Sequence, residues 1–155
     1  AYPDLQQMMD DCRAAGLSPI ICSSYRSVEK QEQLYENKIS RLMAEGYSYE
    51  RAKEEAGKVV AIPGTSEHQT ALALDIVDAT NQNLDETQES TAVQKWLIEH
   101  SWEYGFVLRY PNGKSDITGI IYEQWHYRYV GRKAAREMKE RDMCLEEYLE
   151  WLGTY

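Results

Sequence analysis

Two histidines and two carboxylates lie in short segments of this sequence where their spacing could support metal chemistry. His68 precedes Asp75 by seven residues in SEHQTALALDIVD, and His126 follows Glu123 by three residues in YEQWHYRYVG. Imidazole and carboxylate groups are zinc ligands, and a catalytic zinc site uses three of them and keeps one position open. The residues suggest a zinc centre with His68, Asp75 and His126 as ligands and Glu123 as a general base for water.

The spacing by itself leaves a second interpretation open. The helix-borne HExxH pattern of many metallopeptidases is absent from the sequence, and a histidine and an aspartate seven residues apart often occur by chance. Taken alone, the pair favours a buried His68 hydrogen-bonded to Asp75. An acid on an apolar strand is costly unless a cation or hydrogen bonds compensate. The third histidine, His100, has no such motif around it and is predicted to be structural.

Backbone geometry limits how these residues can meet. Two residues three apart on a regular strand face opposite sides, so Glu123 and His126 can approach one ion only if the chain turns or bulges between them. Ala71 and Ala73 are expected to share one strand face with Asp75. Their small side chains would leave room for a ligand above the sheet.

Hydrophobic periodicity, capping residues and turn residues predict the elements that must position this chemistry. We expect helices over residues 3–15, 28–44, 49–58, 91–104, 132–141 and 145–152, and strands over 18–24, 71–77, 106–110 and 127–130. Residues 78–90 are expected to form a surface loop. This order indicates an α+β fold in which helices cover a small, largely antiparallel sheet.

The composition narrows the class of protein. The chain has 155 residues, which suits one domain spanning residues 1–155, and its 43% hydrophobic and 28% charged content is typical of a globular protein. A net charge of −9 without a basic cluster excludes nucleic acid as a partner. The sequence contains no heptad repeat that would require an obligate protein partner. Three cysteines allow one disulfide with a free thiol, or three buried thiols.

Three segments, in chain order, resemble the motifs of one zinc peptidase family. SSYRSVEKQ resembles the arginine motif of the D-alanyl-D-alanine carboxypeptidases, SEHQTALALD their SxHxxGxAxD signature, and YEQWHYRYVG their ExWH element. The resemblance covers about residues 17–131 and is greatest to the VanY-type carboxypeptidases, which trim peptidoglycan stem peptides. It implies the small α+β zinc fold shared with the Hedgehog signalling domain, and one Zn²⁺ per chain.

The resemblance also implies roles for individual residues. His68, Asp75 and His126 match the zinc ligands of the family, and Glu123 matches its catalytic base. Arg26 matches the arginine that holds the terminal carboxylate of the substrate and polarises the scissile carbonyl, a task that suits a planar, permanently charged guanidinium. An ordinary surface ion pair is the alternative for Arg26.

Three further side chains are expected to contact the substrate, and two positions depart from the family pattern. Ser66 matches a substrate-contacting serine, although it could instead cap the loop before the strand. Gln31 is expected at the same peptide end as Arg26, and Trp125 beside the substrate. Ala71 replaces a family glycine, which a strand conformation tolerates and a positive φ would not. Gln124 replaces the usual proline.

The activity implied by the resemblance is removal of the C-terminal D-alanine from stem peptides, with D,D-carboxypeptidase activity preferred. The alternatives are an L,D-carboxypeptidase acting on tetrapeptides, a dipeptidase acting on free D-Ala-D-Ala, or a non-catalytic zinc module that binds cell-wall peptide. Glu123 favours an enzyme, because a binding module needs no base at the metal. We expect the protein to act outside the bacterial membrane, held by an N-terminal anchor absent from this chain, with a cytoplasmic enzyme as the alternative.

Overall fold

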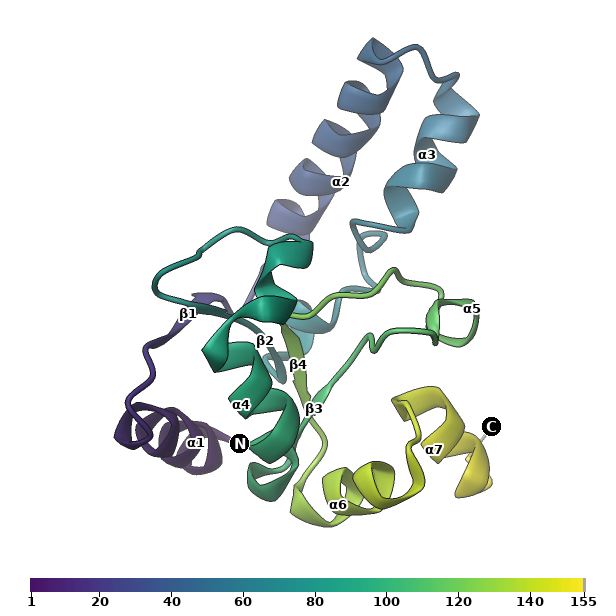
Figure 1. The fold of residues 1–155 in the computed structure, drawn as a ribbon. Coiled ribbons are helices and arrows are strands. Elements are labelled where there is room, and N and C mark those ends of the chain that lie inside the picture. The colour runs from purple at the N-terminus through teal and green to yellow at the C-terminus, as the bar shows by residue number, and fades with distance from the viewer. Residues whose placement is uncertain (155) are drawn as a thin grey trace.

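A four-stranded antiparallel sheet with the strand order β1-β2-β4-β3 forms the centre of the molecule (Figure 1). The computed structural model describes residues 1–154. In chain order the elements are α1 (Tyr2–Ala14), β1 (Pro19–Ser23), α2 (Val28–Ala44), α3 (Tyr49–Gly57), the 3-10 helix η1 (Glu67–Thr70), β2 (Ala73–Asp78), η2 (Glu86–Ser90), α4 (Ala92–His100), η3 (Ser101–Tyr104), β3 (Phe106–Leu108), α5 (Ser115–Thr118), β4 (His126–Tyr129), α6 (Arg132–Arg141) and α7 (Leu145–Trp151). The expected α+β fold is confirmed.

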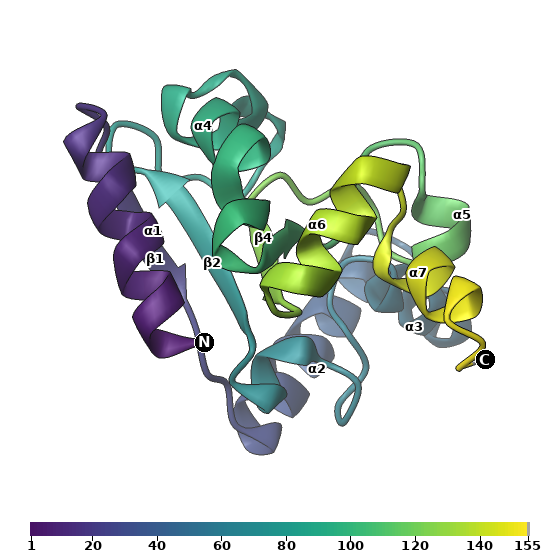
Figure 2. The same ribbon diagram turned by 90° about the horizontal axis from the view of Figure 1, so that it is seen from below.

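The alternation of side chains along β2 separates the core from the opposite face of the sheet. Leu74 and Ile76 pack into the main hydrophobic core, to which α1 contributes Met8 and Met9 and α4 contributes Val93 and Leu97. Helices α1 and α4 lie along β1 and β2 on this side (Figure 2). Because neighbouring residues on a strand face opposite sides, Asp75 points away from this core.

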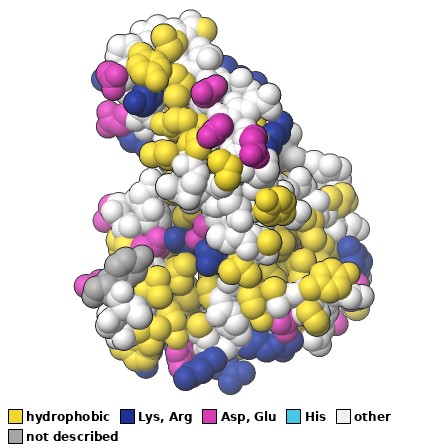
Figure 3. Space-filling view, turned by 180° about the vertical axis from the view of Figure 1, so that it is seen from behind, with side chains coloured by type: hydrophobic (Ala, Val, Ile, Leu, Met, Phe, Trp, Pro, Cys, Tyr) yellow, Lys and Arg dark blue, Asp and Glu magenta, His cyan; other side chains and the backbone are white. Residues whose placement is uncertain are grey.

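Helices α2 and α3 form a hairpin that projects from the body of the molecule (Figure 1). The hairpin has a small core of its own, made by Ile39, Leu42, Ala52 and Ala56. Seen from behind, the hairpin carries a mixture of hydrophobic, acidic and basic side chains, and hydrophobic side chains also form broad areas on the body below it (Figure 3). Both helices begin at serine caps, because Ser27 accepts a hydrogen bond from the backbone N–H of Lys30 and Ser48 from that of Arg51.

The structure corrects the expected start of the central strand. β2 begins at Ala73 rather than at residue 71, and Ala71 ends η1 with φ of 58°. The chain needs a left-handed residue here because one helical turn must stop before the strand starts. Ala71 therefore does not share the strand face of Asp75.

Three other expectations are refined. The predicted loop 78–90 contains the short helix η2, and the predicted helix 91–104 is divided into α4 and η3. All three cysteines are unpaired, so no disulfide forms among them. Cys12 and Cys144 are buried and Cys22 is exposed.

Candidate active site

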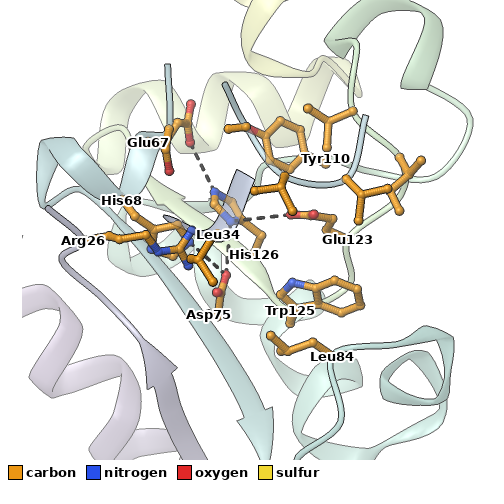
Figure 4. Close-up of a pocket in the computed structure, with 16 residues that line it drawn as sticks. Arg26, Leu34, Glu67, His68, Asp75, Leu84, Tyr110, Glu123, Trp125 and His126 are labelled. Carbon is orange, nitrogen blue, oxygen red and sulfur yellow. Dashed lines mark hydrogen bonds and ion pairs between the residues drawn. The ribbon is translucent and has the colours of Figure 1, made fainter. Parts of the chain in front are cut away.

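Three potential metal ligands meet on the face of the sheet opposite the main core. Asp75 on β2 pairs directly with His126 on β4, and His68 comes from η1. Oδ1 of Asp75 lies 3.3 Å from Nε2 of His68 and 3.1 Å from Nδ1 of His126 (Figure 4). Ligand atoms at 2.0–2.2 Å from a tetrahedral zinc ion lie roughly 3.3 Å from one another, so this spacing fits such an ion.

The outer nitrogens of both imidazoles already have partners. Nδ1 of His68 lies 2.7 Å from the carbonyl oxygen of Ser24, and Nε2 of His126 lies 3.4 Å from a carboxylate oxygen of Glu67. A neutral imidazole that donates its one N–H outward directs a lone pair inward. Two lone pairs and the Asp75 carboxylate would then repel one another, and a dication would relieve that repulsion. A simple buried His–Asp pair explains this arrangement less well than a metal site.

Burial and charge set the protonation of the carboxylates and of His126. Burial would raise the pKa of Asp75, but hydrogen bonds from His126 and His68 lower it to about 2. Burial lowers the pKa of His126, yet its hydrogen bonds to Asp75 and Glu67 outweigh that effect and raise it to about 9 in the absence of a cation. In the metal-free protein, a second proton on His126 therefore occupies the place beside Asp75 that a metal ion would take.

Glu123 reaches the same site because the chain turns before β4. The backbone N–H of His126 donates to the carbonyl of Glu123 at 3.3 Å, which confirms the expected irregularity at Gln124 and Trp125. A carboxylate oxygen of Glu123 lies 3.7 Å from Nδ1 of His126. Burial raises the pKa of Glu123 to about 7, and the charge of Asp75 adds to this effect while those of His126 and Arg26 oppose it. A carboxylate with this pKa is suited to general-base catalysis near neutral pH.

Arg26 lies beside His68 and is held by neutral groups. Its NH1 donates to Oε1 of Gln31 at 2.8 Å, its NH2 donates to the hydroxyl of Ser23 at 3.2 Å, and its backbone N–H donates to the carbonyl of His68 at 3.0 Å. Among residues 1–154, no carboxylate forms an ion pair with Arg26, so the alternative of a surface ion pair is not what the structure contains. The guanidinium is available to an anionic ligand.

Gln31 lies behind Arg26 rather than in the pocket. Its side chain is fully buried, and its amide nitrogen donates to the carbonyl of Ala61 at 2.6 Å. Gln31 thus connects Arg26 to the segment that follows α3. The structure does not bring it into the position of a substrate contact that the sequence suggested.

A pocket of about 300 Å³ opens over these groups. Arg26, Ser66, Glu123 and Trp125 all line it, together with the three potential ligands. Ser66 makes no capping hydrogen bond to the backbone of η1 through its side chain. Its hydroxyl is therefore free for another partner. His100 lies outside this pocket, where it contacts Glu103 and Trp96, as expected for a structural residue.

Several pocket residues were missed by the sequence analysis. Glu67 and Tyr110 lie against His126, and an apolar wall is formed by Leu34, Val59, Val60, Ala61, Leu84, Ile120 and Ile121. Glu67 directly precedes a predicted ligand, which was a usable signal. The wall residues come from separate segments of the chain and share no common spacing in the sequence, so only the folded structure shows that they meet.

The two residues that depart from the family pattern, Ala71 and Gln124, are each locally unfavourable in free energy. Ala71 adopts the left-handed conformation that its family glycine would adopt without strain. Gln124 is buried, and its Oε1 has no hydrogen-bond partner within residues 1–154. Neither residue lines the pocket over the ligand cluster.

A family model for D-alanyl-D-alanine carboxypeptidases, VanY, matches residues 1–132. The chain belongs to the VanY family. It is 46% identical over 148 residues to a D-alanyl-D-alanine carboxypeptidase of Enterococcus faecalis, an alignment that covers 95% of this chain and 53% of that protein. The chain spans about half the length of the curated relatives it matches.

Solved structures of carboxypeptidases share the arrangement of nearly the whole chain. VanYB in complex with D-alanine-D-alanine superposes with a TM-score of 0.86 at 44% identity, covering 96% of this chain and 80% of that one. A VanY D,D-pentapeptidase variant in complex with Zn(II) superposes with a TM-score of 0.84 at 44% identity and the same coverage. The LD-carboxypeptidase LdcB has a TM-score of 0.84 at 40% identity, covering 96% of this chain and 65% of that one.

Proposed function

We propose that this VanY-family chain is a zinc-dependent carboxypeptidase that removes the C-terminal D-alanine from peptidoglycan stem peptides. The observation that carries the proposal is the convergence of His68, Asp75 and His126 on one point, with Glu123 beside it. The zinc-bound and D-Ala-D-Ala-bound VanY structures support the same metal and substrate class. Glu123 argues against a module that only binds peptide.

His68, Asp75 and His126 would hold the zinc ion, one per chain. When bound, zinc supplies Lewis acidity that activates water and polarises a peptide carbonyl. Glu123 takes the proton from the attacking water and later passes it to the leaving amine. Arg26 binds the terminal carboxylate and so restricts cleavage to the last peptide bond. Its positive charge also offsets the negative charge that develops on the carbonyl oxygen.

Ser66 and Trp125 complete the substrate site in this proposal. The hydroxyl of Ser66 would form a hydrogen bond with the peptide backbone, which its position in the pocket lining and the absence of a capping hydrogen bond support. Trp125 and Leu84 lie together in the close-up and offer an apolar surface to a small side chain such as the methyl of alanine (Figure 4). The apolar wall suits the short side chain better than a charged one.

D,D-carboxypeptidase activity is the preferred assignment because the VanY structures with D-Ala-D-Ala and Zn(II) are more similar in sequence than LdcB. L,D-carboxypeptidase activity on tetrapeptides is the second candidate, which the LdcB likeness favours. Action on peptidoglycan peptides places the enzyme outside the bacterial membrane in this proposal. In residues 1–154, no helix is long and apolar enough to cross a membrane.

Mass spectrometry of the reaction with synthetic peptides tests the function. The substrates are a stem pentapeptide ending in D-Ala-D-Ala and a tetrapeptide ending in one D-Ala, each with and without a chelator. We expect the pentapeptide to lose one alanine, and we expect the chelator to abolish this cleavage. Cleavage of the tetrapeptide alone would assign an L,D-carboxypeptidase. Absence of cleavage with zinc bound would contradict both and favour a binding module.

A variant series tests the role of the base. Glu123→Ala is expected to keep zinc bound and lower kcat by about 10²–10⁴-fold, the range typical of general-base catalysis. Glu36→Ala on α2, an exposed carboxylate outside the pocket, is the control and should retain wild-type turnover. Turnover by Glu123→Ala close to that of the wild type would remove Glu123 from the mechanism.

A further inference from the structure

Glu67 has a largely buried carboxylate, and positively charged or donating groups contact both of its oxygens. Its Oε1 accepts hydrogen bonds from Nε of Arg109 at 2.6 Å and lies 2.8 Å from NH1 of Arg128. Its Oε2 lies 3.4 Å from Nε2 of His126. The side chain is only 11% exposed, although it lines the pocket. With its oxygens so occupied, Glu67 is poorly placed to act as a second base.

The hydrogen bond to His126 decides which ring nitrogen faces the metal position. A neutral imidazole carries one proton, and the nitrogen without it is the metal ligand. Nδ1 faces Asp75 and Nε2 faces Glu67, so when a cation replaces the Nδ1 proton beside Asp75, the carboxylate of Glu67 keeps the remaining proton on Nε2. Such a carboxylate also increases the electron donation of the ring to a bound cation.

We propose that Glu67 is a positioning residue for the metal centre, which fixes the orientation and tautomer of His126 and so raises the affinity of the site for zinc. This inference rests on the zinc site of the proposed function. The second ligand, His68, is held by a neutral carbonyl of Ser24, so Glu67 supplies the only charged outer partner of the two imidazoles among residues 1–154.

Arg109 holds Glu67 from the side away from the metal. Its guanidinium donates to both carboxylate oxygens of Glu146 on α7, at 2.9 and 2.5 Å, while its Nε donates to Glu67. A forked pair of this kind fixes the guanidinium in one orientation. Arg109 and Arg128 together hold Oε1 of Glu67, so Oε2 stays directed at His126 even without Glu146.

A purely structural role is the competing explanation, because Glu67 also neutralises Arg109 and Arg128. The two roles differ in what they predict for zinc. If Glu67 only balances charge, losing it should weaken folding as much as losing Glu146 does, without a specific effect on the metal. If Glu67 positions His126, zinc affinity should fall when Glu67 is changed and should hold when Glu146 is changed.

The experiment measures the zinc dissociation constant by competition with a chelator for the wild type, Glu67→Ala, Glu67→Gln and the matched control Glu146→Gln. Circular dichroism and thermal unfolding of each variant check the fold. Glu67→Ala is expected to bind zinc about 10–100-fold more weakly, the range found when an outer partner of a ligating histidine is removed. Glu67→Gln keeps an uncharged acceptor and should lose less, about three- to tenfold. Glu146→Gln should stay within twofold of the wild type.

A spectroscopic readout separates positioning from stability. With Co²⁺ in place of zinc, the visible absorption bands report the ligand geometry, and they should change in the Glu67 variants and not in Glu146→Gln. Zinc affinity of Glu67→Ala within twofold of the wild type, or an equal loss in Glu146→Gln, would overturn the proposal. If Glu67→Ala does not fold, an unchanged affinity of Glu67→Gln overturns it instead. Failure of the wild type to bind zinc would instead refute the metal site itself.

Discussion

At the residue scale, the position of Glu123 joins catalysis to the stability of the protein. The pKa of its carboxyl is about 7 in the folded protein without metal, against 4.5 for an exposed glutamate. A buried acid with a raised pKa favours the protonated form. The folded state therefore binds one more proton than the unfolded state between pH 4.5 and 7, and this contribution to stability is lost as the pH rises through that window.

The variant Glu123→Gln should remove this pH dependence. In metal-free protein, the free energy of unfolding of the wild type should fall relative to that of Glu123→Gln between pH 4.5 and 7, by up to about 3 kcal/mol. Urea unfolding of both proteins at several pH values in the presence of a chelator measures the difference. Parallel curves for the two proteins would show that Glu123 ionises normally in the fold.

Gln31 is predicted to act through Arg26 rather than by touching substrate. Gln31→Glu would place a carboxylate beside the guanidinium, where it would compete with the terminal carboxylate of the peptide. We expect KM to rise about tenfold or more with a smaller change in kcat, because the lost binding is shared by ground state and transition state. Gln33→Glu, an exposed position on the same turn of α2, is the control. An unchanged KM in Gln31→Glu would contradict this role.

At the element scale, the junction between η1 and β2 carries a backbone strain that a glycine at position 71 would relieve. Ala71 has φ of 58°, and an L-residue with a side chain loses about 1–2 kcal/mol in the left-handed region relative to glycine. Replacing Ala71 with glycine would recover only part of this free energy, because glycine loses more conformational freedom on folding. Ala71 and Leu72 connect the helix of one ligand, His68, to the strand of another, Asp75.

Ala71→Gly should therefore stabilise the protein by about 1 kcal/mol, which corresponds to a rise in Tm of about 2–4 °C for a chain of this size. Thermal unfolding of the metal-free protein measures the change. Asp142→Gly is the matched control, since Asp142 ends α6 with φ of 53° and aspartate tolerates that region better than alanine. A Tm of Ala71→Gly at or below that of the wild type would show that the backbone at Ala71 is not strained.

The elements that could be predicted from the sequence are those with a strong local pattern. The serine caps of α2 and α3 and the turn before His126 follow from short-range chemistry, and the structure confirms them. The conformation of Ala71 could not be predicted, because alanine in an apolar run matches a strand pattern. The place of Glu67 next to His68 indicates that it lies near the site, but its role could not be predicted, because its partners Arg109 and Arg128 lie far along the chain.

At the scale of the whole molecule, metal binding should couple to folding. The three ligands come from η1, β2 and β4, so the unfolded chain cannot present them together. An ion that binds only the folded state stabilises it by about 2.7 kcal/mol when present at a hundredfold excess over its Kd. Zinc is thus expected to stabilise the entire sheet and not one local segment.

Thermal unfolding with zinc or with a chelator tests this coupling. Zinc at about a hundredfold excess over its Kd should raise the Tm of the wild type by about 5–10 °C. His126→Ala should lose the shift, and His100→Ala should retain it because that imidazole lies outside the pocket. An equal shift in His126→Ala would place the stabilising ion elsewhere.

The separate core of the hairpin made by α2 and α3 has a consequence for motion. With only Ile39, Leu42, Ala52, Ala56 and the flanking Tyr35 packed between the two helices, the outer turns can open while the sheet remains intact. Amide hydrogen exchange should then be fast at the tip of the hairpin and slow at its base, where Gln31 joins Arg26 to Ala61. The hydrogen bonds that connect the Arg26 guanidinium to Gln31 and Ala61 would then persist while the tip of the hairpin opens and closes.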